Sequence, residues 1–379
     1  MTLERTTLLM ALLGITLASS VWAAPDSRGA DIFTVNSLAD PGDDGCNVAE
    51  CTLREAILAA SAIAGEKVIE FQPGLAGTIL LSSELLINFN GLTIEGPGPD
   101  VIQVSGNNAS RVFLLNGSDV VIRGLTIRDG NTGTDNGAGF RILGPGSPTL
   151  ENLRITNNTN IGQGAGIWLF FSPATLRHLE ISDNTGALAA LLINGSEGHD
   201  VLVENVTISG NVANQQASGL QVLSNAGQTV TLRYLTVANN SGSSLGASIS
   251  GSAGVVAVEA SLFANNAGRD LAFSNAEGSV NNSLIANSAT SIPGQNNLVN
   301  VAPALGALLF IEGSVTRVHP LGLGPGVEHV DDAIGNAGCG TLVTEDQIGN
   351  SRPINLSCDV GAFELPEGVD ILFEDRFEQ

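Results

Sequence analysis

One apolar–polar pattern recurs along the chain between Val120 and Asn287. The apolar run of each recurrence ends on a large side chain, which we call the anchor: Ile127, Ile155, Ile181, Ile208, Val237, Phe263 and Ile285. Successive anchors are separated by 28, 26, 27, 29, 26 and 22 residues. A period of roughly 20–30 residues that varies by a few is typical of a solenoid whose insertions fall in loops.

Each repeat contains strand and turn patterns and almost no helical pattern. Positions −5, −2 and 0 relative to the anchor are mostly apolar, as in Ile122, Leu125 and Ile127. A polar corner such as Asn239-Asn240 follows, and asparagine tolerates the left-handed backbone that a sharp corner requires. A second, glycine-led strand comes next. The repeats are shorter than βαβ units, which need about 30 residues or more, so the pattern predicts an all-β, right-handed parallel β-helix.

Position −4 is charged in six consecutive repeats, and the sign of the charge alternates. These residues are Arg123, Glu151, Arg177, Glu204, Arg233 and Glu259. Equivalent residues of stacked parallel strands lie about 4.8 Å apart, so alternating charges favour one register and oppose a slip. A charged catalytic or polyanion-binding cleft is the alternative. We favour a structural ladder because each charge already has opposite neighbours.

The ends of the chain differ from the repeats in composition. Residues 1–23 have the features of a secretory signal, with Arg5 before the apolar run Leu8–Leu17 and small residues near Ala23. We expect one β-helix domain over 24–365, followed by a tail over 366–379. Within that domain, 24–66 should form a strand and a helical cap, 67–300 the coils, and 301–365 a closing segment at the far end. No later stretch is long enough to be a membrane span.

One helix is expected, at the amino-terminal end of the coils. Thr52 and Glu55 form a capping box in CTLREAILAASA, and Leu53, Ile57, Ala60 and Ala64 make one apolar stripe. A solenoid needs its open end covered, and an amphipathic helix meets that need.

Four cysteines fall into two close pairs, Cys46 with Cys51 and Cys339 with Cys358. Four cysteines allow three disulfide pairings, and we favour the local ones because each pair brackets one end of the solenoid. Export from the cell would permit disulfides. A zinc site is the alternative, but no histidine lies at ligand spacing beside either pair.

Composition narrows the classes of partner. The chain has 46 glycines and 4% aromatic residues, which suits thin and closely stacked coils. Its net charge is −23 and Lys67 is its only lysine, which argues against binding to nucleic acid or to anionic membranes. The same charge disfavours a polyuronate ligand unless a cation bridges it.

Two end motifs carry a family resemblance. CTLREAI at Cys51–Ile57 resembles the CSLREA motif of bacterial exported β-helix proteins. DQIGNSRPINLSCDVGAFE at Asp346–Glu364 is similar to the closing block of choice-of-anchor Q proteins, and the repeats between resemble the pectin-lyase-like right-handed β-helix. The resemblance implies this fold, export, and an extracellular or bacterial cell-surface location. It implies no reaction.

Pectate lyases, pectin lyases and polygalacturonases share this fold, so catalysis needs its own test. A lyase needs an arginine base beside carboxylates that hold Ca²⁺, and Arg128, Asp129 and Asp183 are the candidates. An inverting glycosidase needs carboxylates about 6.5–9.5 Å apart, and Asp129 and Asp183 stand two coils, or about 9.6 Å, apart. The same corner holds Asn157 between them, and glycine or asparagine in later coils. We therefore favour a structural corner there, with no metal or cofactor unless the protein is a lyase.

A binding role has one focus in the sequence. In GIWLFFSP, alternation directs Trp168 and Phe170 outward, where two exposed aromatic rings would stack on sugars. The alternative is that neighbouring loops such as Pro145–Pro148 cover both rings. The sequence favours a non-catalytic surface or extracellular protein that presents a rigid face for adhesion or glycan contact. A polysaccharide lyase or hydrolase and a purely structural passenger remain as alternatives, and the oligomeric state stays open.

Overall fold

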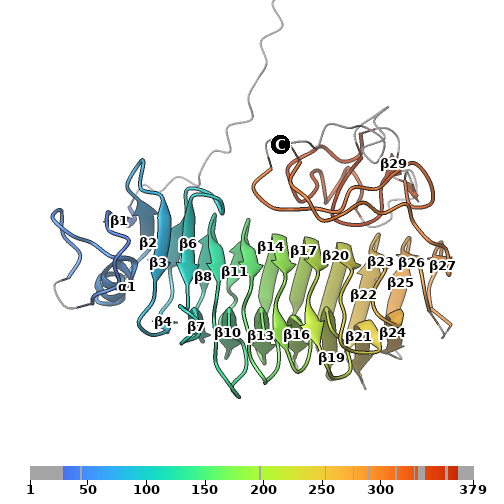
Figure 1. Ribbon diagram of the computed structural model, residues 1–379, viewed down its shortest axis with the longest axis horizontal. Coiled ribbons are helices and arrows are strands. Elements are labelled where there is room, and N and C mark those ends of the chain that lie inside the picture. Colours follow the sequence, from blue (N-terminus) through green and yellow to red (C-terminus); the bar gives the residue numbers. More distant parts are fainter. Residues whose placement is uncertain are drawn as a thin grey trace, which may run out of the picture.

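The described part of the chain is a long stack of parallel strands with one helix at its amino-terminal end (Figure 1). The computed structural model describes residues 29–365, apart from 43–44, 196–197, 252, 276, 289–290, 312–313, 328, 332–337 and 355–356. The predicted signal at 1–23 and the tail at 366–379 lie outside the described residues. No helix in the described part of the chain is long and apolar enough to cross a membrane.

Two long parallel sheets run the length of the stack. The larger contains β1 (Asp31–Val35), β2 (Lys67–Phe71), β3 (Gly77–Leu80), β5 (Leu92–Glu95), β6 (Ile102–Ser105), β8 (Val120–Arg123), β9 (Thr126–Arg128), β11 (Thr149–Glu151), β12 (Arg154–Thr156), β14 (Ala174–Ser182), β17 (Val201–Ser209), β20 (Thr229–Ala238), β22 (Val255–Glu259), β23 (Leu262–Ala264), β25 (Ser279–Asn281), β26 (Leu284–Ile285) and β27 (Leu298–Val299). The smaller contains β4 (Leu85–Ile87), β7 (Phe113–Asn116), β10 (Phe140–Leu143), β13 (Ile167–Phe170), β16 (Leu191–Asn194), β19 (Leu220–Ser224), β21 (Leu245–Gly251) and β24 (Arg269–Asn275). Short pairs join β15 (Thr185–Gly186) to β18 (Val212–Ala213) and β28 (Val330–Asp331) to β29 (Ser357–Cys358).

The larger sheet bends at position −3 of each repeat. The residue there has a left-handed backbone, for example Asn152 (φ 55°), His178 (φ 54°) and Asn205 (φ 53°). The bend separates an early face, which includes β8 and β11, from a late face, which includes β9 and β12; β14, β17 and β20 continue through the bend into both. Each coil therefore has three faces around one core.

The anchors form one column inside the stack. Ile127 pairs with Ile155, Ile155 with Ile181, and so on through Ile208, Val237, Phe263 and Ile285. All seven side chains are fully buried. The predicted parallel β-helix is thus confirmed, and the apolar columns form its core.

A second column, of asparagines, lies at position +3. Asn158, Asn184, Asn211, Asn240 and Asn266 are all buried. The amide oxygen of each accepts from the residue one coil earlier; Asn211 Oδ1, for instance, accepts from the backbone N–H and from Nδ2 of Asn184 at 2.9 and 3.0 Å. These bonds satisfy backbone groups that the sharp corner removes from the strand ladders.

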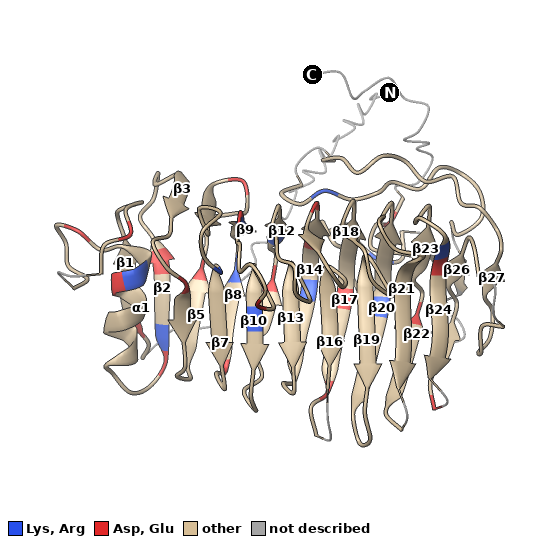
Figure 2. Ribbon diagram, turned by 60° about the horizontal axis from the view of Figure 1, so that its bottom comes forward, with Lys and Arg blue, Asp and Glu red and all other residues tan. Residues whose placement is uncertain are grey.

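The charge ladder lies along the early face, where Figure 2 shows red and blue residues alternating from strand to strand. Its six members are in register with one another across β8, β11, β14, β17, β20 and β22. Arg177 Nε lies 3.0 Å from Glu151 Oε1, and Arg233 pairs closely with Glu204. Glu95 extends the row by one coil, opposite Arg123. Glu151 and Glu204 are nearly buried, so their charges are less exposed than the sequence alone indicates.

Reversing one interior charge of this ladder should destabilise the fold. Glu204→Arg places a positive charge between Arg177 and Arg233, and we expect a loss of about 1 kcal/mol or more because like charges then face each other across the sheet. High salt should reduce the loss. Val255→Arg, at an exposed position outside the ladder, is the control, and urea unfolding at low salt is the measurement. Equal midpoints for the two variants would contradict a role of the ladder in stability.

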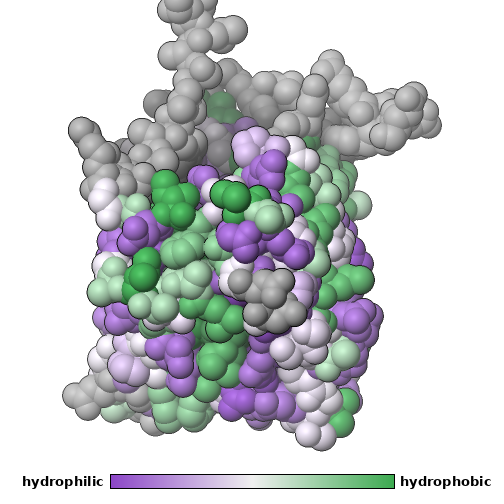
Figure 3. Space-filling model, turned by 90° about the vertical axis from the view of Figure 1, so that its left-hand side faces the viewer, coloured by the Kyte–Doolittle hydropathy of each residue, from purple (hydrophilic) through white to green (hydrophobic). Residues whose placement is uncertain are grey.

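Helix α1 (Leu53–Ser61) covers the amino-terminal end of the coils, as predicted. Its capping box is formed, since Glu55 N–H donates to Thr52 Oγ1 at 3.2 Å and Thr52 N–H donates to Glu55 Oε2 at 2.8 Å. Leu53, Ile57 and Ala60 are buried against the first coils, and the helix ends before Ala64. Figure 3, which faces this end, shows hydrophobic and hydrophilic residues mixed on the surface.

Both local disulfides are present, joining Cys46 to Cys51 and Cys339 to Cys358. The prediction that the closing segment, residues 301–365, covers the far end is wrong in its location. The chain turns back after β27 and lies along the late face, beside the central and later coils (Figure 1). Gly361 N–H donates to Ala260 O at 2.8 Å, and Thr207 Oγ1 donates to Gln347 Oε1 at 2.6 Å. A hydrophobic cluster also holds the segment there, since Tyr234, Leu262 and Leu284 of the coils pack with Leu321, Val330 and Val360 of the segment.

Candidate functional site

The three predicted catalytic candidates fall into two separate ion-pair networks. Arg128 Nε pairs with Asp129 Oδ2 at 2.7 Å, and Ser105 Oγ donates to the same oxygen. Asp183 Oδ2 instead lies 2.9 Å from Arg317 NH2 of the closing segment. Asp129 and Asp183 both have left-handed backbones (φ 51° and 56°), as does Asn157 between them (φ 56°). The corner geometry explains why Asp, Asn and Gly alternate there, which favours the structural interpretation over a catalytic pair.

The closing segment engages the late face through a buried carboxylate. Glu180 is fully buried, and its two oxygens accept from the backbone N–H of Arg317 at 2.7 Å and from Arg317 Nε at 2.8 Å. Arg154 Nε lies 3.3 Å from the same carboxylate. Farther along, the Arg352 guanidinium lies 4.1 Å from the centre of the Tyr234 ring. Asp183, one of the predicted site residues, is therefore already paired with Arg317 of the closing segment.

His178 occupies the left-handed bend of its coil and faces several charged groups. Burial lowers its pKa to about 4, and the nearby charges of Arg177 and Arg352 also lower it, whereas Glu151 raises it. Its Nδ1 lies 3.8 Å from Glu151 Oε1, and its Nε2 lies 3.3 Å from Asn205 Nδ2. The imidazole is therefore neutral in the folded protein at neutral pH.

This neutral histidine should make the protein less stable at acidic pH. The unfolded chain binds a proton near the ordinary pKa of 6.5 and the folded chain only near 4. The neutral histidine therefore contributes its full stabilisation above pH 6.5. This stabilisation is lost as the pH falls toward 4, with about 2 kcal/mol lost between pH 7 and 5. His178→Asn, which keeps a residue suited to the left-handed bend, should remove this part of the loss. Urea unfolding of both proteins at the two pH values measures it, and parallel pH profiles would contradict it.

The prediction that Trp168 is an exposed sugar-stacking ring is wrong. The side chain does point outward from the smaller sheet, but only 7% of it is exposed. Leu192 of the next coil and Leu188 of the loop before that strand cover it. The ring stacks on Phe170 with centroids 4.8 Å apart. Phe170 remains partly exposed.

Phe171 extends the aromatic surface beyond the Trp168–Phe170 pair. The Phe171 ring lies 4.0 Å from the Phe170 ring, and Phe171 is 40% exposed. On the other side, the Arg141 guanidinium lies 5.2 Å from the centre of the Trp168 ring. We call Trp168, Phe170 and Phe171 the aromatic stack.

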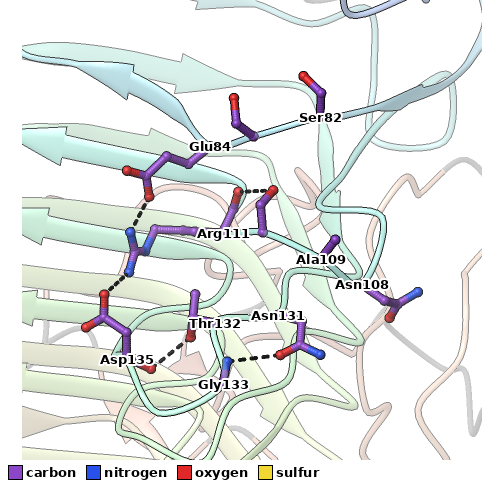
Figure 4. A pocket seen from close by; sticks show the side chains of 11 residues that line it. Ser82, Glu84, Asn108, Ala109, Arg111, Asn131, Thr132, Gly133 and Asp135 are labelled. Carbon is purple, nitrogen blue, oxygen red and sulfur yellow. Dashed lines mark hydrogen bonds and ion pairs between the residues drawn. The ribbon is translucent and has the colours of Figure 1, made fainter.

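A polar pocket of about 570 Å³ opens where β4, β7 and β10 begin (Figure 4). It is lined by Ser82–Glu84, Asn108–Arg111, Asn131–Gly133 and Asp135. These residues come from the corners that precede the strands of the smaller sheet, in three neighbouring coils. The stack therefore sets hydroxyl, amide and carboxylate groups at one-coil intervals around a single concavity.

Arg111 lies at the centre of this pocket and is only 6% exposed. Its guanidinium donates to Gly137 O at 2.8 Å and to Asn136 O at 3.1 Å, and it pairs with Asp135 at 2.7 Å and closely with Glu84. Figure 4 shows the two carboxylates on opposite sides of the guanidinium. Arg141 NH1 also pairs with Asp135 at 2.7 Å, which links the pocket to the aromatic stack. We call this site the Arg111 pocket.

The electrostatics of the pocket suit binding more than proton transfer. Burial raises the pKa of Asp135, but hydrogen bonds from the Asn136 N–H and Arg111, with the charges of Arg141 and Arg111, outweigh it and lower that pKa below its usual value. An ionised carboxylate accepts hydrogen bonds but cannot act as the general acid that glycoside hydrolysis requires. Within the described residues, no group of three or more His, Cys, Asp or Glu is placed to hold a metal ion.

The Arg111 pocket was not predicted from the sequence, although the sequence contains a signal for it. Glu84 lies 27 residues before Arg111, and Asp135 lies 24 residues after it. These separations match one coil, as do the separations of the charge ladder. The pocket was missed because two of its three strands lie before the first anchor, where the repeat is harder to see.

Comparisons with known proteins agree with the coordinates on the fold. A family model described as a right handed beta helix region matches residues 83–257. No curated protein matches the chain. Among solved structures, the crystal structure of Jun a 1, the major allergen from cedar pollen, is similar with a TM-score of 0.43 and 15% identity, over 62% of this chain and 67% of that one. The family model and the strand pairing together identify the coils as a right-handed parallel β-helix. The resemblance to CSLREA and choice-of-anchor Q proteins stays a prediction.

Proposed function

We propose that this protein is a secreted or cell-surface glycan-binding protein, and that the Arg111 pocket is its contact site. Two disulfides and a predicted signal support an extracellular location. The observation that carries the proposal is the fixed guanidinium of Arg111, bonded on two sides to carboxylates and on its remaining edge to main-chain carbonyls. A site fixed in this way binds without first ordering its own side chains.

The pocket and its surroundings have the chemistry of a sugar site. Carboxylate, amide and hydroxyl groups accept and donate the hydrogen bonds that sugar hydroxyls make. Arg141 connects Asp135 to Trp168, and the partly exposed rings of Phe170 and Phe171 continue from there. Aromatic faces of this kind pack against the apolar faces of sugar rings. An extended glycan would thus contact polar groups in the pocket and aromatic surface beside it.

Binding without cleavage is the part of the proposal that separates it from a lyase or hydrolase. Asp129 and Asp183 are held by different arginines, and Asp135 is ionised by its own partners. Each of these three carboxylates is paired with an arginine, which supports a binding role over acid–base chemistry.

Filling the pocket tests the proposal. Ala109 is exposed on the pocket wall, so Ala109→Trp should block the cavity without touching the Arg111 ion pairs. Ala267→Trp, at an exposed corner of a distant coil, is the matched control. On a glycan array, the parent and the control should bind and Ala109→Trp should lose at least about tenfold in affinity.

Three outcomes would contradict the proposal. The parent could bind no glycan, Ala109→Trp could bind as well as the control, or a reducing-end assay could show that the parent cleaves the glycan it binds. The first would leave the structural-passenger alternative, and the last would establish the lyase or hydrolase alternative.

A further inference from the structure

We infer that the Arg111 pocket selects uncharged, hydroxyl-rich glycans over polyuronates. The inference rests on the proposed function and adds the ligand class. The charges around the pocket are balanced, because Arg111 and Arg141 face Glu84 and Asp135. Each of the two carboxylates contacts at least one guanidinium.

The cations at this site are already used. Arg111 is the sole basic residue among the described residues that line the pocket, and its guanidinium is bonded to two carboxylates and two main-chain carbonyls. Behind the pocket, Arg54 pairs with Asp40 at 2.9 Å and donates to Ser83 O and Glu84 O. A uronate carboxylate would therefore have to displace an existing partner from a nearly buried guanidinium, which leaves another charge unpaired.

The net charge of the whole molecule also disfavours the binding of acidic glycans. A net charge of −23 gives the surroundings a negative potential that repels a polyanion during its approach.

A neutral hydroxyl has no such cost. The carboxylates of Glu84 and Asp135 are 35% and 48% exposed, so their outer lone pairs are open to hydroxyl donors without loss of the arginine contacts. Hydrogen bonds to an ionised acceptor are stronger than neutral ones. The pocket thus offers strong acceptors while its net charge remains close to zero.

Matched oligosaccharides test this selection directly. Galactose and galacturonic acid tetramers differ at C6 alone, as hydroxymethyl against carboxylate. Titration calorimetry on the full-length protein should show the galactose tetramer bound at least about tenfold more tightly than the galacturonate tetramer. Its affinity should change less than about twofold between about 50 mM and 500 mM NaCl, because no net charge is neutralised on binding.

A substitution should reverse the preference. Asp135→Asn keeps the shape of the side chain but leaves Arg141 and one side of Arg111 without their carboxylate. We expect it to gain at least about tenfold in affinity for the galacturonate tetramer, with a strong salt dependence. The control is Asp200→Asn, which removes an acidic side chain near the start of β17, away from the pocket.

The outcomes separate the inference from the proposed function. If the parent binds the galacturonate tetramer as tightly as the galactose tetramer, or if Asp135→Asn gains no more than Asp200→Asn, the inference is overturned and the glycan-binding proposal stands. If no tetramer binds and the glycan array is also negative, both are overturned.

Discussion

Glu180→Ala is expected to destabilise the protein by about 3–5 kcal/mol and to release the closing segment from the late face. Glu180 is fully buried, and Arg317 contacts it through its guanidinium and through its backbone N–H. Removing the carboxylate leaves the positive charge of Arg317 at an interface with one exposed partner, Asp183, and removes the partner of Arg154. Removing one partner of an ion pair costs much more stability when that partner is buried than when it is exposed.

Asp183, three residues after Glu180, contacts the same arginine and provides a matched control. Asp183 Oδ2 is 2.9 Å from Arg317 NH2, but the side chain is 45% exposed, so Asp183→Asn should cost less than about 1 kcal/mol. Urea unfolding gives the stability of each variant. Limited proteolysis followed by mass spectrometry shows whether cleavage within 301–365 becomes faster. Equal stability of the two variants, or unchanged cleavage in Glu180→Ala, would show that the buried pair does not hold the segment.

The coils could be predicted because every repeat carries the same information. The anchors and the charged residues at −4 recur at fixed offsets, so a register could be assigned before any coordinate was known. Pairs such as Glu204 with Arg233 then follow from the offset alone. The capping box at Thr52 is a local signal of the same directness.

The position of the closing segment could not be predicted because its contacts have no period. Arg317 lies 137 residues after Glu180, and Gln347 lies 140 residues after Thr207. A pair of this kind occurs once, so nothing in the sequence distinguishes Glu180 from other acidic residues at outward positions. The cysteine pair Cys339 and Cys358 marked the segment as tied together but not where it docks.

For the candidate sites too, the features that the repeat fixes could be predicted, and those that depend on loops could not. Alternation correctly directed Trp168 out of its sheet, but whether an outward side chain is exposed depends on the loops and side chains of the next coil. Leu188 and Leu192 decide it here. The Arg111 pocket combines residues one coil apart, which the period could have related. Its concavity depends on how three corners are shaped, and no pattern of residue types reports that.

The asparagine column provides the most selective test of how the coils are held together. Asn239 and Asn240 are neighbours in one corner, yet their roles differ. Asn240 is buried, and its Oδ1 accepts from the backbone N–H and from Nδ2 of Asn211 at 3.0 and 2.9 Å. Its own Nδ2 donates to Ile208 O and Ala238 O at 3.0 Å each. Asn239 is exposed and has a left-handed backbone (φ 57°).

Asn240→Ala should therefore cost about 3 kcal/mol or more, because it leaves the buried amide groups of Asn211 and two carbonyls without these partners, at about 1–3 kcal/mol for each orphaned group. Asn239→Ala should cost only about 1 kcal/mol, the penalty of a Cβ in a left-handed residue that asparagine tolerates better. Asn239→Gly should be close to the parent, since glycine adopts this backbone freely. Urea unfolding of the three variants decides the matter. If Asn240→Ala is no less stable than Asn239→Ala, corner conformation rather than the buried amide column holds successive coils in register.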